Sequence, residues 1–367
     1  MRVLNVQLRD FRTYSRAEAH LGEGLTVVHG PNGAGKSNLL EALYFGCTGR
    51  SPRTRNEREL VRFGAPATRV VVGLADGADT HELSVGFEPG QPKRMSSDGA
   101  PVERLLDVET RPLLSVFVPD RLELLKGAPS VRRSHLDQFV AAVWPARGPD
   151  RLEYSRVLAQ RNALLGRIRA GRATHATIAT WDRQLARQAM LLREHRADAA
   201  ALLADPFTER AAELGLTGAA SLDYRPRSRA SGEDEFVVEL QARLAGDLER
   251  GFSTHGPHRD ELAVLRDERE LRLYGSQGEQ RLALLALLLA ERAVLARERR
   301  RTPLMLLDDV MSELDAGRRE LLARELTSGG QSVIATTDLA HVPGADAAGV
   351  TRLRVSPGAI LQEALAA

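Results

Sequence analysis

The sequence predicts an α/β fold with a mixed β-sheet, an antiparallel β lobe, and an inserted helical lobe built as a short helical hairpin. Three observations favour this class. The fully apolar runs at 304–307 and 332–335 are typical of strands that a sheet buries on both faces. An apolar run at 25–29 leads through a glycine-rich turn into a helix. Apolar residues then recur at helical spacing over 151–192.

Length and composition fit a globular protein with more than one lobe. The chain has 367 residues, of which 43% are hydrophobic and 27% are charged. No apolar run approaches the roughly 18 residues that cross a bilayer. The N-terminal residues alternate between apolar and polar, unlike a signal peptide. We therefore expect a cytoplasmic protein that does not contact a membrane.

Charge and cysteine content narrow the possible sites. At a net charge of +2, the chain could bind an anionic polymer only through local patches. The single cysteine, Cys47, excludes an intramolecular disulfide and a zinc site built from cysteines. We expect it to pack as a small core residue.

The N-terminal region is predicted to consist mainly of strands. Strands are expected at 1–11, 25–29, 69–74, 81–87 and 113–118. In the first strand, Leu4, Val6 and Leu8 should share one face. The turn-forming residues between 74 and 81 predict that the flanking strands form an antiparallel hairpin.

Two helices are predicted next. Tyr154, Leu158, Leu165 and Ile168 recur at helical spacing, as do Ile178, Trp181, Leu185 and Leu192, with a polar connection near 170–177. This pattern predicts antiparallel helices that contact each other along one face. A plain hairpin packed on the domain and a projecting coiled-coil arm both fit so few heptads.

These patterns divide the chain into three parts. Residues 1–145 form the first half of the sheet domain with the antiparallel lobe, 146–235 the inserted helical lobe, and 236–367 the second half. The polar, turn-rich stretch 220–235 is expected to be a loop or hinge.

The turn after the second strand has the pattern of a phosphate-binding loop, G-x-x-x-x-G-K-[ST]. Its backbone N–H groups would surround a β-phosphate, Lys36 would reach the β and γ oxygens, and the Ser37 hydroxyl would ligate Mg²⁺. The strand before and the helix after favour this interpretation over a structural glycine turn. The loop comprises Gly30, Pro31, Asn32, Gly33, Ala34, Gly35, Lys36 and Ser37.

The scarcity of lysine supports a special role for Lys36. Of 51 basic residues, only Lys36, Lys93 and Lys126 are lysines, and the rest are arginines. A compact ammonium on a flexible stem suits a phosphate-binding turn better than a broad guanidinium does.

A second strand ends in carboxylates that a Mg²⁺-nucleotide site needs. Four apolar residues at 304–307 precede Asp308 and Asp309. Asp308 would hold Mg²⁺ directly or through water, and Asp309 would polarise the attacking water. Asp309 and Lys36 are therefore the two expected catalytic residues. Two acids that merely cap a strand are disfavoured, because Ser312, Glu313, Leu314 and Asp315 follow immediately.

A third element is the turn that opens a long apolar helix from about 279 to 297. It contains Ser276, Gln277, Gly278 and Glu279, and a helix N-terminus with a serine is an anion site. Here the sequence resembles the ABC-type ATPases, whose corresponding turn covers the γ-phosphate held by the opposite subunit. The resemblance implies a homodimer that forms on ATP binding and assigns 312–315 as the D-loop.

Within that superfamily the whole chain resembles the RecF family, bacterial DNA-repair relatives of SMC proteins. The matching segments span almost the whole chain in the family's order: 8–14, 38–42, 49–54, 125–133, 256–260, 275–281 and 307–315. The resemblance implies a Mg²⁺-dependent, DNA-dependent ATPase head that closes over gapped or single-strand/double-strand junction DNA. It also implies partnership with RecO and RecR in loading RecA.

Two departures from transporter-type ATPases affect the expected rate. Asp309 stands where those enzymes carry glutamate, and Thr336 to Asp338 lack their histidine. The shorter carboxylate predicts slow hydrolysis, which suits a release switch. No glutamine occurs near 118–120, so no nucleotide-sensing residue is assigned.

Candidate DNA contacts remain open. Arg50, Arg53, Arg55 and Arg58 crowd a turn-rich segment and would either contact phosphates or form a solvated face. The arginines at 297–301 end a helix, where capping is favoured. The cluster of His255, His258 and Asp260 is expected to be a structural hydrogen-bond group.

Two other functional classes are considered. A transporter-energising ATPase subunit is disfavoured because Lys36 and Asp308 lie far apart in the chain. A scaffold in which nucleotide is purely structural would not respond to the γ-phosphate.

Overall fold

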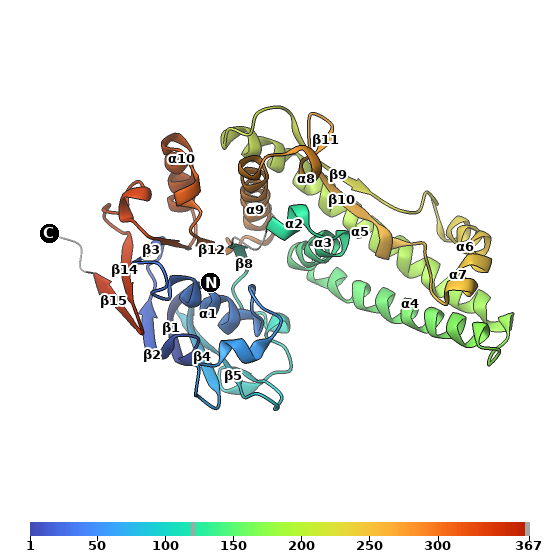
Figure 1. The fold of residues 1–367 in the computed structure, drawn as a ribbon, viewed down its shortest axis with the longest axis horizontal. Coiled ribbons are helices and arrows are strands. Elements are labelled where there is room, and N and C mark those ends of the chain that lie inside the picture. The colour runs from blue at the N-terminus through green and yellow to red at the C-terminus, as the bar shows by residue number, and fades with distance from the viewer. Residues whose placement is uncertain (119–121, 364–367) are drawn as a thin grey trace. The chain divides into compact units, whose positions relative to one another are not determined.

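The computed structural model describes residues 1–118 and 122–363, apart from the side chains of Ala176 and Glu313 (Figure 1). The chain forms two compact units. The first comprises Met1–Arg121, Glu213–Gly215 and Leu295–Ala367, and the second Leu122–Ala212 and Leu216–Val294. Both predicted domain boundaries, after residues 145 and 235, fall inside the second unit. The reason is that helices before residue 145 and the strand after residue 260 pack together there.

The first unit is built on a mixed sheet. All neighbouring strands in it are parallel except the last two of the chain. Its order is β15 (Ala359–Glu363), β14 (Thr351–Ser356), β3 (Leu25–His29), β13 (Ser332–Thr336), β12 (Leu304–Asp308) and β8 (Leu114–Phe117). Every residue of β12 and β13 is buried, which confirms the prediction from their apolar runs.

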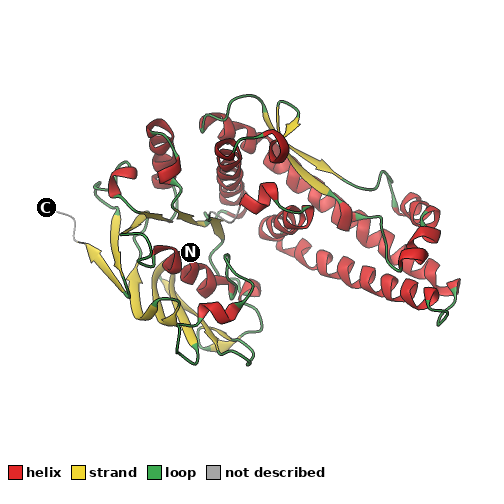
Figure 2. Ribbon diagram, in the orientation of Figure 1, coloured by secondary structure: helices red, strands yellow, loops and turns green. Residues whose placement is uncertain are grey.

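A second sheet in this unit, whose strands are among those drawn in yellow in Figure 2, pairs its neighbouring strands antiparallel throughout. Its order is β2 (Tyr14–His20), β1 (Arg2–Phe11), β4 (Thr68–Asp76), β5 (Asp79–Phe87), β6 (Arg94–Ser97) and β7 (Ala100–Pro101). The β4–β5 pairing confirms the predicted hairpin. Helix α1 (Lys36–Thr48) contacts both sheets, so their apolar faces and the buried Cys47 share one core.

The predicted inner face of the first strand is wrong at one position. Val6 and Leu8 are buried, but Leu4 is 36% exposed and Val3 is buried instead. The register between β1 and β4 shifts between Val3 and Asn5. A β-bulge at this point reverses the alternation, and the apolar pattern alone does not reveal it.

The second unit is mainly helical. Its helices are α2 (Glu123–Lys126), α3 (Pro129–Val143), α4 (Gly148–Arg169), α5 (Ile178–Glu213), α6 (Glu233–Ala242), α7 (Leu244–Arg250), α8 (Leu271–Tyr274) and most of α9 (Gln277–Arg299). Helix α10 (Ala316–Thr327) belongs to the first unit. The pair α4 and α5 confirms the predicted helical hairpin. No helix in the described part of the chain is long and apolar enough to span a bilayer.

A three-stranded sheet in the second unit corrects the loop expected at 220–235. Residues 220–225 form β9 (Ala220–Arg225), which pairs antiparallel with β10 (Glu261–Arg266), and β11 (Arg269–Glu270) follows. The pairing comes from a segment remote in sequence, so local composition did not predict it. Helix α6 begins at Glu233, and only 226–232 is irregular.

Candidate nucleotide-binding site

The phosphate-loop candidate connects the end of β3 to the start of α1. Gly30 has φ 149°, and a Cβ placed there would lie 2.2 Å from the Val355 carbonyl oxygen. Gly35, which precedes α1, has φ 116°. Side chains are therefore excluded at Gly30 by contact and disfavoured at both positions by conformation. The glycines are required by the shape of this loop.

The lysine of the loop holds the loop itself. Lys36 Nζ donates to the Gly30 carbonyl at 2.8 Å and to the Pro31 carbonyl at 3.0 Å. Burial lowers the pKa of Lys36, and the negative charges of Asp309 and Asp308 oppose this shift. Lys36 is thus near both carboxylates that the sequence assigned to the same site.

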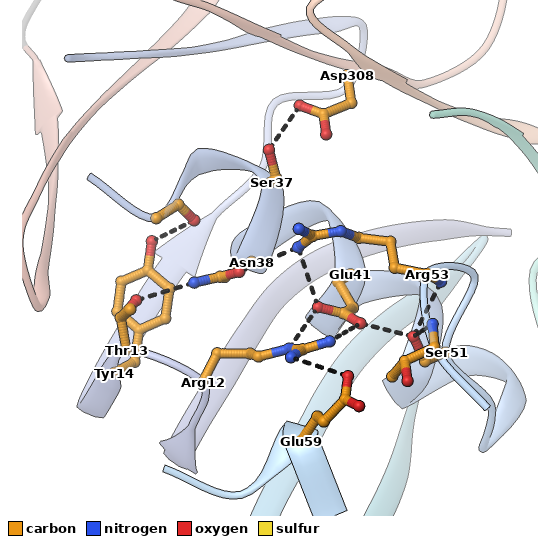
Figure 3. A network of polar contacts seen from close by, with 12 residues as sticks. Arg12, Thr13, Tyr14, Ser37, Asn38, Glu41, Ser51, Arg53, Glu59 and Asp308 are labelled. Carbon is orange, nitrogen blue, oxygen red and sulfur yellow. Dashed lines mark hydrogen bonds and ion pairs between the residues drawn. The ribbon is translucent and has the colours of Figure 1, made fainter. Parts of the chain in front are cut away.

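The structure brings Ser37 and Asp308 together. Ser37 Oγ donates to Asp308 Oδ1 at 2.9 Å (Figure 3). Burial raises the pKa of Asp308, while the hydrogen bond from Ser37 and the charge of Arg53 oppose the shift. A hydroxyl and a carboxylate oxygen are hard donors of the kind that Mg²⁺ prefers. These two side chains therefore fit the predicted metal site.

Asp309 has an unusual environment. Its φ is 52°, and its N–H donates to the Ala335 carbonyl at 3.1 Å. Its Oδ1 is buried and has no hydrogen-bond partner among the described residues. Leaving a buried polar atom unpaired costs about 1–3 kcal/mol. Such an atom is suited to accepting a hydrogen bond from a water or ligand at the site.

A buried carboxylate on α1, missed at the sequence level, organises the region around the loop. Glu41 accepts two hydrogen bonds of 2.8 Å from Arg12, one of 2.5 Å from Ser51, and one of 3.2 Å from Arg53 (Figure 3). Both Arg12 and Glu41 lie in segments that carried the family resemblance, which was the available signal. Glu41 thereby ties two separate segments to α1, the turn at Arg12 and the stretch from Ser51 to Arg53.

The first residues of α1 and the chain before β2 are also connected. Tyr14 donates to the Gly35 carbonyl at 2.9 Å, and Asn38 Nδ2 donates to Thr13 Oγ1 at 3.0 Å. These contacts fix the start of α1, and with it Ser37.

Of the arginines considered for DNA contact, Arg53 already has partners. Its Nη1 donates to Asn38 and to Glu41. Arg50, Arg55 and Arg58 are exposed. Arg53 is therefore part of the network around α1, whereas the other three remain available at the surface.

The serine turn is exposed and locally ordered in the second unit. Ser276 N–H donates to Glu279 Oε2 at 2.7 Å, and Glu279 N–H donates to Ser276 Oγ at 3.3 Å. This reciprocal pair is a capping box at the start of α9. Glu279 also pairs with Arg266. Ser276, Gln277 and Gly278 are exposed, and the preceding Tyr274 is 65% exposed.

The predicted D-loop follows β12 directly. Ser312 Oγ donates to the Asp309 carbonyl at 2.9 Å, and Asp315 caps α10 by accepting from Arg318 N–H at 3.0 Å. Leu314 is buried. The side chain of Glu313, and residues 119 and 120 of the stretch searched for a nucleotide sensor, lie outside the described residues.

The histidine group is a hydrogen-bond cluster, as expected. His258 Nε2 donates to the Ser253 carbonyl at 3.1 Å, because a carbonyl can only accept. His258 Nδ1 therefore accepts from the Tyr154 hydroxyl at 2.7 Å. Burial lowers the pKa of His258 to about 4. The imidazole is neutral at pH 7, and it joins α4 to the loop before β10.

Comparisons with known proteins agree with this architecture. Residues 5–115 match the AAA domain family model. A DNA replication and repair protein RecF from Heliobacterium modesticaldum is 36% identical and matches 93% of each chain. The RecF of Streptomyces avermitilis is also 36% identical and matches 98% of this chain and 99% of its own.

Solved structures give the same result. One, described as the recombination mediator protein RecF-ATP in the RecFOR pathway, has a TM-score of 0.87 at 26% identity, covering 99% of this chain and 98% of its own. An SMC head bound to the C-winged helix domain of ScpA has a TM-score of 0.60 at 16% identity, covering 100% of this chain and 98% of its own, and shows likeness of fold alone. These likenesses confirm the predicted fold class, an ABC-type ATPase head.

Proposed function

The chain belongs to the RecF family of DNA replication and repair proteins, and on that premise we propose that two copies of it close over DNA when ATP is bound. The observation that carries the proposal is the convergence of Lys36, Ser37 and Asp308 at one point, where Ser37 and Asp308 are 2.9 Å apart. These residues come from opposite ends of the sequence, and only the fold joins them.

ATP is the proposed substrate. The glycine-rich turn presents backbone N–H groups at a helix N-terminus, which favours a phosphate. Lys36 would exchange the Gly30 and Pro31 carbonyls for phosphate oxygens, a change its flexible stem permits. A solved relative described as RecF-ATP supports this choice. Ser37 and Asp308 would hold Mg²⁺, which would neutralise charge on the phosphate oxygens.

Hydrolysis is proposed to be slow and to act as a release switch. Asp309, with its buried Oδ1 free to accept, would orient and polarise the attacking water. Aspartate is one methylene shorter than glutamate, so its carboxylate reaches less far toward a water. A slow step leaves the closed state long-lived enough to mark a site on DNA.

The pocket is proposed to be completed by a second copy. The Ser276 turn is exposed, sits at a helix N-terminus, and is shaped by its capping box. It would supply N–H groups to the γ-phosphate held by the partner's loop. The D-loop residues Ser312 to Asp315 would lie at the same dimer interface.

The biological setting is proposed from the relatives. We infer binding to gapped or single-strand/double-strand junction DNA, with RecO and RecR as partners and RecA as the protein finally loaded. The description of a solved relative as a recombination mediator in the RecFOR pathway supports this setting.

Measuring dimerisation and DNA retention with ATP, with ADP, and for Lys36→Met tests the proposal. We expect ATP to produce dimers that retain DNA, and expect neither ADP nor Lys36→Met to do so. Sedimentation velocity and filter retention of a gapped duplex report the two effects. Equal behaviour with ATP and ADP would indicate a scaffold in which nucleotide is structural, and would refute the proposal.

A further inference from the structure

The antiparallel sheet carries a row of arginines across five adjacent strands. Arg16 of β2 lies opposite Arg9 of β1, and Arg9 lies opposite Arg69 of β4. Arg69 lies opposite Gly86 of β5, and Gly86 lies opposite Arg94 of β6. Four of the five positions in one register row are therefore arginine.

All four side chains lie on the same face of the sheet. Directly opposite residues in neighbouring strands project to the same side. The alternate residues, such as Leu8 and Val70, are buried against α1, whereas all four arginines are exposed. The row thus lies on the face of the sheet opposite the core.

Folding does not explain this arrangement of charge. Among the described residues, none places a carboxylate within ion-pair distance of these four guanidinium groups; Arg69 Nε donates only to Ser84 Oγ, at 3.0 Å. The nearby Glu18 instead accepts hydrogen bonds from Asn5 and Gln7. Like charges directly opposite each other destabilise a sheet. The row therefore lowers the stability of the sheet, and an anionic partner would relieve the repulsion between its charges.

Gly86 leaves the middle of the row open. A Cβ built at this position meets nothing closer than 3.9 Å, so packing does not require glycine there. Its φ is also outside the left-handed region. Gly86 therefore adds no side chain to the row between Arg69 and Arg94.

We propose that this arginine row, Arg9, Arg16, Arg69 and Arg94, binds the sugar–phosphate backbone of DNA. The inference rests on the proposed DNA-binding function and adds the surface that carries it. Five strands at a spacing of ~4.8 Å make the row roughly 19 Å long. That length matches about five to six nucleotides at 3.4 Å each. Guanidinium groups pair with phosphates in bidentate fashion, and phosphate contacts carry no sequence preference.

The salt dependence of DNA binding tests the row. The double variant Arg9→Gln/Arg69→Gln is compared with the full unaltered chain on a fluorescent gapped duplex, with a non-hydrolysable ATP analogue. Each lost phosphate contact lowers the slope of log affinity against log salt by about 0.9, so the slope should fall by about 2. Affinity at moderate salt should fall about tenfold to a hundredfold. Arg324→Gln, a 73% exposed arginine on α10, serves as the control and should change neither.

Stability provides an independent readout. Because the variant removes like-charge repulsion, its melting temperature without DNA should rise by about 1–3 °C while DNA binding weakens. A variant that simply unfolds would show a lower melting temperature. Retained binding of the ATP analogue checks the fold.

A gain of function is expected from Gly86→Arg. The substitution places an arginine at the fifth position of the row, where a Cβ meets no atom closer than 3.9 Å. The salt slope should then increase by about 1, with tighter binding.

Four outcomes would contradict the assignment. The salt slope could stay unchanged in the double variant and fall instead in Arg55→Gln/Arg58→Gln. This result would assign the DNA contacts to the exposed arginines that follow α1. If poly-glutamate bound as tightly as DNA, and this binding were lost in the double variant, the row would be assigned to acidic proteins. Weaker DNA binding by Gly86→Arg would indicate that DNA does not follow the row. If the unaltered chain binds no DNA with any nucleotide, the proposed function fails as well.

Discussion

At the residue scale, the site depends on a few side chains whose chemistry cannot be exchanged. Position 36 combines a tight turn, two carbonyl acceptors within 3.0 Å, and two nearby carboxylates. A compact ammonium satisfies all of these partners, whereas a planar guanidinium is larger and its donors are fixed in direction. The presence of lysine at position 36, in a chain that prefers arginine at most basic positions, is consistent with that geometry.

Lys36→Arg therefore tests the fit of the loop without removing its charge. We expect at least a tenfold loss in ATP binding or in kcat/KM, because the guanidinium cannot occupy the space of the ammonium. Binding of a fluorescent ATP analogue and steady-state hydrolysis measure it. Lys126→Arg, at an exposed position, should have no effect. Unchanged activity in Lys36→Arg would remove the argument from lysine scarcity.

Asp308 should make stability depend on pH. Its folded-state pKa is raised above the ordinary 3.8, so the folded protein holds this proton more tightly than the unfolded chain does. The stability of the folded protein therefore falls as pH rises above 3.8, because Asp308 must then be buried in its ionised form or hold its proton. Asp308→Asn keeps an acceptor for Ser37 and removes the charge. Its melting temperature should exceed the unaltered protein's by about 1–3 °C at pH 8, with a smaller gain at pH 4, close to the ordinary pKa of 3.8.

The same variant should lose hydrolysis by roughly a hundredfold or more, because an amide is a poor Mg²⁺ ligand. Differential scanning fluorimetry across pH and a phosphate-release assay give the two values. If the difference in melting temperature between Asp308→Asn and the unaltered protein were the same at every pH, burial of the ionised Asp308 carboxylate would not reduce stability.

The sequence predicted the central residues of the site but not the side chains that hold the surrounding segments in place. Lys36, Ser37 and Asp308 fit local motifs, and the fold places them together. Glu41 and its partner Arg12 were missed because their pairing joins separate segments, and no local pattern records it. Leu4 was placed on the wrong face for a similar reason, since the bulge arises from pairing with β4.

At the element scale, α4 and α5 contain a buried charge that periodicity does not show. Arg161 is fully buried, and it pairs with Asp182 of α5 at 2.7 Å and Asp247 of α7 at 2.9 Å. Arg161 Nη1 also donates to Ser253 Oγ at 2.6 Å. The apolar repeat predicted both helices, yet an arginine in a helix normally indicates the solvated side. The ion-pair network fixes the orientation of three helices in this unit.

Arg161→Met should strongly destabilise the second unit. It leaves the carboxylates of Asp182 and Asp247 buried without a counter-charge, which costs about 3–5 kcal/mol. Both tryptophans, Trp144 and Trp181, lie in this unit, so urea unfolding followed by their fluorescence reports it selectively. The exposed Arg156→Met is the control and should leave the midpoint near its original value. If the urea midpoint of Arg161→Met changed as little as that of the control, the ion-pair network would not stabilise this unit.

At the scale of the whole molecule, the site is assembled from distant parts of one chain and, we propose, from two chains. The first unit joins the N-terminal and C-terminal segments around the phosphate loop, while the serine turn belongs to the second unit. The sequence placed the serine turn in 236–367, the second half of the sheet domain, because order along the chain does not record which helices share a core. The dimer follows from the role proposed for this turn.

Mixing two inactive variants tests that central claim most directly. Lys36→Met disables the loop and Ser276→Arg the turn, so every site in either homodimer contains one defective half. A mixed dimer of the two contains one fully intact site, because two-fold symmetry pairs each loop with the other copy's turn. In an equimolar mixture, ATP hydrolysis should rise well above that of either variant alone, to no more than about half of the unaltered rate, since each mixed dimer has one working site of two. Hydrolysis that stays at the level of the separate variants would contradict a nucleotide pocket shared between two copies.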